Sequence, residues 1–325
     1  MRYSHRFFLY APVAALLLLG LAASLYWLTA YQRFTTALAR LNGHEVLPGV
    51  RLSYTAAETG GFPFRLDAVL KDVRLQVQTS HGPVSWTSQH FALHSLDYGD
   101  MHILLEAAGL QRLSWYDPRG IRHQLGFTPG LLRASVLGDH GVVRRIDIEL
   151  YDARTHLFRV LHAEFHLRKN PRRNALDLVV MADRLRLDTK NGATPADHIT
   201  KLRLAGRVTP ASSWHGLLAG QASWSQAAAA FQAASGHLDI AHLSLAWRSA
   251  EAKGNGVLSL DGAARPQGIL RLSIDGEPVA NGSSKGLLSA LLAAASRDHS
   301  GVRIAFKDGV SYLNASPVGL VAPLF

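Results

Sequence analysis

The sequence contains no cysteine, and it also lacks the short motifs that mark common catalytic sites. Without cysteine there are no disulfides, no thiolate metal sites and no cysteine nucleophile. No G-x-S-x-G elbow, no phosphate-binding P-loop and no G-x-G-x-x-G turn after a strand is present. The carboxylates are scattered through alternating segments and do not meet in one motif. We therefore expect a protein that is not an enzyme and that carries no cofactor.

Acidic residues are too few to balance the basic ones, which leaves a formal charge of +10 at pH 7. Such a charge favours anionic surfaces, among them phospholipid headgroups and nucleic acid. The Lys and Arg residues are spread along most of the chain, however, and no nucleic-acid-binding motif accompanies them. Nucleic acid is therefore not an expected partner. With 325 residues, 48% of them hydrophobic, the chain is long enough to fold around a core of its own.

One histidine cluster has the composition of a metal site but not its spacing. His162, Glu164 and His166 alternate along an expected strand, so all three side chains point to one face. Alternate residues of a strand lie about 6.5–7 Å apart, which separates the two histidines by about 13 Å. One ion cannot bind both, and the H-E-x-x-H pattern of zinc proteases is missing. We interpret the three residues as a solvated strand face and expect no metal.

From Phe7 to Tyr31 the chain carries no charged residue. A helix of about 25 residues, at 1.5 Å per residue, is long enough to cross a hydrocarbon core of about 30 Å. Basic residues precede the run and aromatic residues lie near its ends, which is typical of a membrane anchor. This predicts a signal-anchor helix over 7–31 and a short cytoplasmic tail over 1–6. A signal peptide cleaved at Ala22-Ala23-Ser24 is the alternative.

The apolar stripe of this helix continues past the uncharged run. Leu28, Tyr31, Phe34, Leu38 and Leu41 recur at steps of three and four, and Asn42-Gly43 then ends the pattern. This predicts a juxtamembrane helix over 32–43 that packs on the domain that follows.

From Val50 onward the dominant period is two. Leu66, Ala68 and Leu70 alternate with polar residues, and the same pattern recurs in later segments, among them 163–167. Turn sequences such as Asp261-Gly262 separate these segments. Strands with one apolar and one polar face predict an antiparallel sheet with hairpins over 44–325.

Two segments break the strand pattern. Ser213 to Ala234 and Ser284 to Ser296 are rich in Ala and Leu and begin with serine, which predicts helices. The sequence NGATPA at 191–196 interrupts the strands and is a weak candidate for a boundary inside the domain.

The motif Gly60-Gly61-Phe62-Pro63-Phe64-Arg65 leads into an expected strand. With this motif the chain resembles domain-of-unknown-function family 2125 (DUF2125), uncharacterised envelope proteins of Gram-negative bacteria. Arg2 and Arg6 before the apolar helix, and the lack of a second span, favour a single-pass protein with its bulk outside the cytoplasm. With the resemblance, this implies the inner membrane and the periplasm. Physically, the glycines permit a tight turn, Pro63 fixes its exit, and the Phe rings can pin it to the sheet. We interpret the motif as a structural turn without a ligand.

The C-terminal third supports a wider similarity. Gly254 to Leu260, Gln267 to Gly276 and the ending from Asp308-Gly309 through Pro317-Val318-Gly319 to Pro323-Leu324 fit the same family. This ending also resembles that of AsmA-like envelope proteins, which are anchored by one N-terminal helix. Members of that group are implicated in moving or organising lipids, and their sheets curl into apolar grooves.

Sequence and resemblance together predict an α+β fold, in which an N-terminal transmembrane helix precedes a large, curved, mostly antiparallel β-sheet with a few packing helices. We expect a non-enzymatic envelope protein that binds or transfers phospholipid or another lipid in an apolar groove. The alternative is an envelope scaffold or assembly factor that contacts another envelope protein. The difference depends on whether helices cover the apolar strand faces. The candidate groove residues are Leu66, Ala68, Leu70, Ala163, Phe165 and Leu167.

Overall fold

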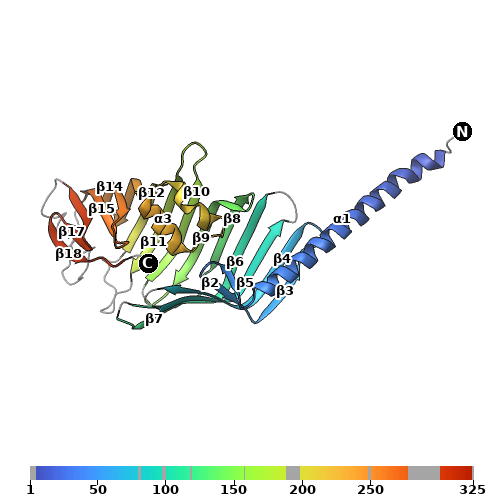
Figure 1. The fold of residues 1–325 in the computed structure, drawn as a ribbon, viewed down its shortest axis with the longest axis horizontal. Helices are drawn as coiled ribbons and strands as arrows, with labels where there is room; N and C mark the ends of the chain where they lie inside the picture. Colours follow the sequence, from blue (N-terminus) through green and yellow to red (C-terminus); the bar gives the residue numbers. More distant parts are fainter. Residues whose placement is uncertain are drawn as a thin grey trace.

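The computed structural model describes residues 5–79, 82–96, 100–117, 119–156, 158–187, 198–247, 250–276 and 301–323. Its strands form one 18-stranded sheet, from which a long helix projects (Figure 1). The elements are α1 (His5–Leu41), β1 (Glu45–Leu47), β2 (Val50–Ser53), β3 (Ala56–Gly60), β4 (Arg65–Thr79), β5 (Gly82–Leu96), β6 (Met101–Tyr116), β7 (Arg122–Phe127), β8 (Leu131–Asp139), β9 (Val142–Arg154), β10 (Phe158–Lys169), β11 (Leu176–Leu187), β12 (His198–Thr209), η2 (Ala211–Trp214), α2 (His215–Leu218), α3 (Trp224–Ala233), β13 (His237–Trp247), β14 (Ala250–Leu260), β15 (Pro266–Asp275), β16 (Val302–Lys307), β17 (Val310–Leu313) and β18 (Ser316–Leu320).

All strand pairings in the described residues are antiparallel, which confirms the predicted sheet. From β8 to β18 each strand pairs with the next one along the chain. At the other end β2 and β3 pair with different parts of β4, and β1 pairs with β2. The two halves of β6 have different neighbours, since the first half pairs with β8 and the second with β7. The sheet is therefore an open meander, with β3 and β18 at opposite ends (Figure 1).

Helix α1 is one continuous helix of 37 residues. Its most apolar stretch has a mean hydropathy of 2.0 and is not buried, so the helix is long and apolar enough to cross a membrane. That property fits a membrane anchor and a signal sequence alike. The segments predicted over 7–31 and 32–43 form a single helix that ends at Leu41, two residues before Gly43 with its φ of 81°.

The C-terminal part of α1 packs on the sheet. Leu38 is buried, and together with Phe34 it contacts apolar residues of β4. The predicted docking of the helix is therefore confirmed at these two residues, whereas Leu28 and Leu41 remain exposed. The β4 residues in this cluster are Ala68, Leu70 and Val73.

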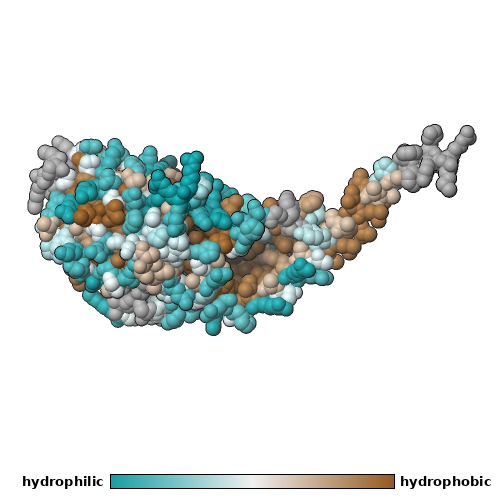
Figure 2. Space-filling view, turned by 45° about the horizontal axis from the view of Figure 1, so that its top comes forward, coloured by the Kyte–Doolittle hydropathy of each residue, from teal (hydrophilic) through white to brown (hydrophobic). Residues whose placement is uncertain are grey.

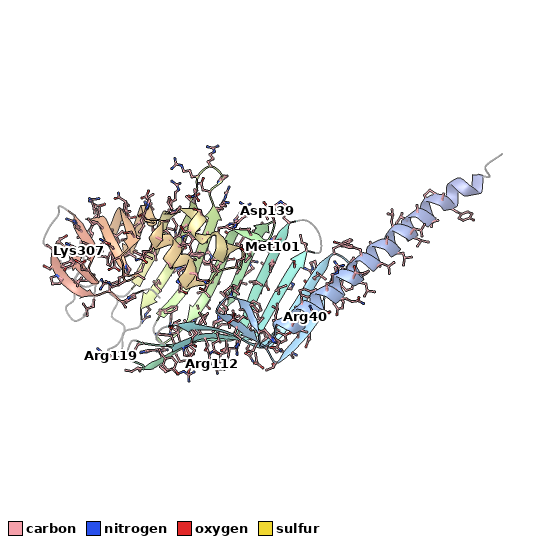
Figure 3. All side chains as sticks on the ribbon, in the orientation of Figure 1. Arg40, Met101, Arg112, Arg119, Asp139 and Lys307 are labelled. Atoms are coloured by element: carbon pink, nitrogen blue, oxygen red, sulfur yellow. The ribbon has the colours of Figure 1, made fainter. Side chains whose placement is uncertain are left out.

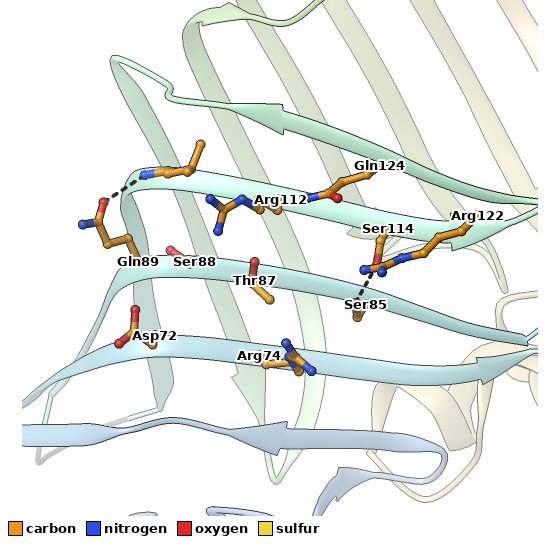
Figure 4. Close-up of a pocket in the computed structure, with 11 residues that line it drawn as sticks. Asp72, Arg74, Ser85, Thr87, Ser88, Gln89, Arg112, Ser114, Arg122 and Gln124 are labelled. Atoms are coloured by element: carbon orange, nitrogen blue, oxygen red, sulfur yellow. Dashed lines mark hydrogen bonds between the residues drawn. The ribbon is translucent and has the colours of Figure 1, made fainter.

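The sheet is bent along a line that crosses its strands, which we call the crease. A mid-strand residue has left-handed backbone in β4 (Asp72, φ 52°), β9 (Asp152, φ 45°) and β11 (Arg184, φ 51°). The register places Asp152 and Arg184 on either side of Leu161 in β10, so the distortions line up between neighbouring strands. An irregular residue of this kind bends a strand as a β-bulge does. Figure 4 shows the strands turning sharply beside Asp72 and Gln89.

The spacing of apolar residues changes from two to three where a strand crosses the crease. In each of the three strands two apolar residues lie three positions apart, and the left-handed residue directly precedes the second of them. Both apolar residues of each pair lie in or pack against the same buried cluster. Because the extra residue shifts the alternation by one, both arms of the bent strand turn their apolar side chains to the same side. The pairs are Leu70 and Val73 in β4, Leu150 and Ala153 in β9, and Ala182 and Leu185 in β11.

Two buried polar side chains form hydrogen bonds at the crease between β5 and β6, where the pairing register shifts. The Ser88 hydroxyl donates to the carbonyl of His90 over 2.8 Å. The Gln111 amide donates to the carbonyls of Ala108 and Gly109 over 3.1 and 3.2 Å. Ser88 and Gln111 are almost completely buried, so they satisfy carbonyls that the bend removes from the regular ladder.

Past the crease the strands near α1 continue as a second arm, which we call the flap. The flap comprises β1, β2, β7, and the segments 73–79, 82–88 and 111–116 of β4 to β6. Figure 3 shows Arg112 and Arg119 in this lower part of the molecule, whereas Met101 and Asp139 lie at the upper ends of their strands.

The helical segment between β12 and β13 differs from the single helix predicted over 213–234. It consists of the 3-10 turn η2, the short helix α2 and the helix α3. Gly220, with a φ of 68°, lies between α2 and α3, and Ser223 then starts α3 through a capping box with Gln226. The segment contacts β9 and also lies against Leu47 of β1. The helix predicted over 284–296 and the boundary predicted at 191–196 lie outside the described residues.

Arg184 tests whether the crease depends on its left-handed residues. Arg184→Val places a β-branched residue in this conformation and should lower the free energy of unfolding by about 1–2 kcal/mol. Arg184→Gly should be tolerated, because glycine adopts positive φ without steric cost. The measurement is urea denaturation of the full chain in detergent micelles. Arg271→Val, at an exposed and regularly paired position of β15, is the control and should not destabilise the protein. Equal effects of Arg184→Val and Arg184→Gly would contradict this account.

Candidate functional site

Three rows of apolar side chains cross the sheet from β4 to β12 on the side that α1 contacts, and we call this surface the inner face. Each row is defined by residues that pair directly across neighbouring strands. Ser95 is the only polar side chain among them. The first row is Leu66, Ser95, Ile103, Val136, Ile146, Leu167 and Leu178; the second is Ala68, Leu93, Leu105, Ala134, Ile148, Phe165, Val180 and Leu204; the third is Leu70, Phe91 and Ala107, then Leu132, Leu150, Ala163, Ala182 and Leu202.

The inner face is covered at its two ends and half open in the middle. At one end α1 buries Ala68 and Leu70, which are 0% and 2% exposed. At the other end the second row continues beyond Leu204 through Leu243 and Gly254 to Leu272 and Val302, which are buried in a cluster of their own. Every residue of the second row from Leu93 to Leu204 is only partly buried. Figure 2 shows apolar residues gathered in a hollow between the base of α1 and the body of the sheet.

The six predicted groove residues all lie on the inner face, but they do not all line open space. Ala68 and Leu70 are covered by α1, and Ala163 packs against the buried cluster at the crease. Leu66, Phe165 and Leu167 are partly buried and lie in the two rows farther from the crease. Sequence alternation placed the six side chains on one apolar face, as the structure has them, but it did not show that α1 covers Ala68 and Leu70.

The outer face of β9 and β10 carries the histidine cluster as part of a ladder of ion pairs. His162 Nε2 lies 3.2 Å from carboxylate oxygens of both Glu149 and Glu164. His166 Nδ1 lies 2.7 Å from Asp147, and its Nε2 lies 2.8 Å from Glu164. The cluster is thus a partly buried, internally paired strand face, whereas the sequence predicted a solvated one. Within the described residues, no group of three or more His, Cys, Asp or Glu side chains is arranged to hold a metal ion.

The His166 imidazole contacts a carboxylate with each of its two nitrogens. Both nitrogens donate only when the ring is protonated, and the hydrogen bond to Asp147, followed by that to Glu164, raises the pKa of His166. The hydrogen bond from Arg133, over 2.8 Å, lowers the pKa of Glu149 in the same ladder. These groups stabilise the outer face in the charged state.

A basic cavity of about 530 Å³ lies on the outer face of the flap. Arg74, Arg112 and Arg122 line it, and within the described part of the chain none of these three forms an ion pair (Figure 4). The hydroxyls of Ser85 and Ser114 bond to each other at 2.8 Å in the same wall. Such a wall can bind an anion. Sequence reasoning missed this cavity, because the three arginines come from different strands and only the register brings them together.

The basic cavity and the inner face lie on opposite sides of the sheet. Val73 and Trp86 of the flap belong to the cluster under α1, whereas Arg74 and Thr87 alternate with them and point to the cavity. One small ligand cannot occupy both sites.

The motif from Gly60 to Arg65 forms the turn between β3 and β4, and we call it the signature turn. It docks on α1, because Trp27 Nε1 donates to the Arg65 carbonyl over 2.9 Å and the Trp27 ring meets the Phe62 ring edge-on at 5.1 Å. Tyr31 stacks on Trp27 and bonds to Thr59 at 2.8 Å. Phe62 and Phe64 are 60% and 62% exposed, so the rings do not pin the turn to the sheet as predicted.

These features define a class of protein with one apolar N-terminal helix docked on a bent, open, antiparallel sheet. A family model described as "Uncharacterized protein conserved in bacteria (DUF2125)" matches residues 27–322. The chain therefore belongs to this family, as its signature turn indicated. No curated protein and no solved structure matches it. The resemblance to AsmA-like proteins stays a prediction from the sequence.

The ladder on the outer face predicts a pH-dependent effect of His166→Gln. A raised pKa means that protonated His166 adds stability below its unfolded value of about 6.5, and that this stability is lost as the pH rises through the folded value. The substitution should lower the free energy of unfolding by about 0.5–1 kcal/mol at pH 6 and by less at pH 9. Denaturant titrations at both pH values measure this, with exposed His90→Gln as the control. A loss that is the same at both pH values would contradict the ion-pair ladder.

Proposed function

We propose that this protein is a membrane-anchored, non-enzymatic envelope protein whose inner face binds the acyl chains of a lipid. The observation that carries the proposal is the second row of the inner face. Its residues are apolar over many consecutive strands and yet remain partly exposed between two covered ends. An apolar surface of this extent, left open in water, is typical of a binding site for an apolar partner.

The chemistry of the inner face favours binding over catalysis. The three rows contain no titratable side chain, so they offer neither an acid nor a base for a reaction. The rows extend straight across the strands, and neighbouring strands lie about 4.8 Å apart. An extended hydrocarbon chain laid along one row meets apolar side chains at every strand.

The length and apolar composition of α1 support the proposal that the protein is located at a membrane. This helix is the candidate membrane span of the described residues, and the sheet packs directly on its C-terminal part. We infer an inner-membrane anchor with the sheet in the periplasm, in keeping with the family resemblance. Anchoring would hold the inner face close to a reservoir of phospholipid.

The decisive test is photo-crosslinking in nanodiscs with a phospholipid that carries a diazirine on its acyl chain. We expect crosslinked peptides from β6 to β10, beyond those from α1. Leu105→Gln, in the second row, should reduce their yield by introducing an amide into the apolar path. Leu104→Gln is the matched control, because the neighbouring side chain lies on the outer face opposite His94 and Ser135.

The thermal midpoint of each variant shows whether it still folds. If crosslinks are confined to α1 and the signature turn in the unaltered chain, the inner face does not bind lipid. In that case a scaffold or assembly factor that contacts another envelope protein becomes the better interpretation.

A further inference from the structure

We propose that the signature turn lies in the headgroup layer of the membrane that α1 crosses, and that it places the open end of the inner face on the membrane surface. The first part of the proposal depends on α1 being a retained anchor. The second part deepens the proposed function, because it names the phospholipids of the adjacent leaflet as the lipid class in reach.

The contact with Trp27 fixes the depth of the turn. The uncharged run of α1 ends at Tyr31, and Trp27 precedes that end by about 6 Å at 1.5 Å per residue. The run is about 37 Å long and a hydrocarbon core about 30 Å thick, so a centred helix has Trp27 close to the core boundary. Phe62, which meets Trp27 at 5.1 Å between ring centroids, must lie at a similar depth.

The hydrogen bond from Trp27 to the Arg65 carbonyl ties the backbone of the turn to the helix at this level. Tyr31 adds a second connection through Thr59, at the end of β3. The turn therefore cannot move away from the membrane surface without breaking both contacts.

The exposed side chains of the turn have the character that this layer favours. Phe62 and Phe64 are 60% and 62% exposed, and Tyr26, which precedes Trp27 in α1, is also exposed. Leu96, 39% exposed, pairs with Arg65 across the strands. We call the exposed apolar residues Phe62, Phe64 and Leu96, which extend from the turn onto β5, the rim. Aromatic side chains gather at membrane interfaces, where their rings contact the upper acyl chains. In water the same cluster would be an uncompensated apolar patch.

The rim is continuous with the inner face. Leu66, the first residue of the first row, directly follows Arg65 of the turn, and Ser95 precedes Leu96. A lipid at the rim therefore lies next to the first apolar row, in which the hydroxyl of the polar residue Ser95 donates to the Leu96 carbonyl.

The absence of cysteine makes a direct measurement of depth possible. Phe64→Cys and Leu96→Cys are labelled with the environment-sensitive dye NBD in the full chain, which is reconstituted into nanodiscs with and without a nitroxide-bearing phospholipid. We expect emission at shorter wavelength and loss of intensity with the nitroxide lipid at both positions. Val257→Cys, on exposed β14 far along the sheet, is the matched control and should keep the emission of a dye in water.

Labels at Phe64 and Leu96 that behave like the Val257 label would overturn the proposal, as would removal of the helix from the mature chain. The depth measurement does not depend on lipid binding by the inner face. A submerged turn without crosslinks on β6 to β10 would refute the proposed function alone, whereas a turn in water with such crosslinks would refute this inference alone.

Discussion

An extra residue at a sharp bend shifts the alternation of a strand by one, so that apolar side chains beyond the bend would point to the opposite side of the sheet. At the crease the spacing of apolar residues increases from two to three, and this keeps them on the same side. In β4 the left-handed Asp72 lets Leu70 and Val73 point to the same side although three positions separate them. β9 and β11 use Asp152 and Arg184 in the same way. Because the apolar side is preserved, the flap and the main sheet share one apolar interior. The buried clusters near α1 and near β10 both lie along this bend.

Helix α1 contributes to the domain as well as to its proposed anchoring. Leu38 completes the cluster on β4, and Trp27 holds the signature turn. The helix therefore has a fixed direction relative to the sheet along its last turns. If α1 crosses a bilayer, the tilt of the helix also sets the angle at which the inner face meets the membrane.

Much of this arrangement could be predicted from local patterns. The alternation at 66–70 and 163–167 identified the strands and their apolar side, and the stripe through Phe34 and Leu38 identified the docking face of α1. The sequence contains the change in apolar spacing from two to three between Leu70 and Val73. This change alone does not predict a bend, because the bend becomes evident only when the neighbouring strands are seen to have the same change at the same place. The basic cavity required the register of β4, β6 and β7, which sequence alone does not provide. The exposure of Phe62 and Phe64 was not predicted, because phenylalanine side chains in a turn are usually expected to be buried. The sequence does not show that this turn docks on Trp27 of α1 and leaves both rings exposed.

The meander connects nearly every strand to its neighbour in the sequence, so the order of strands along the chain is also the order in which the sheet can be assembled. During synthesis each new strand finds its template already in place, and the cost of closing long loops is largely avoided. The contact of the segment around Gly220 with Leu47 of β1 is different, because it joins parts of the chain far apart in sequence. Because β1 to β12 precede Gly220 in the chain, this contact can form only after most of the sheet has been synthesised, and it then joins the helical segment to the flap.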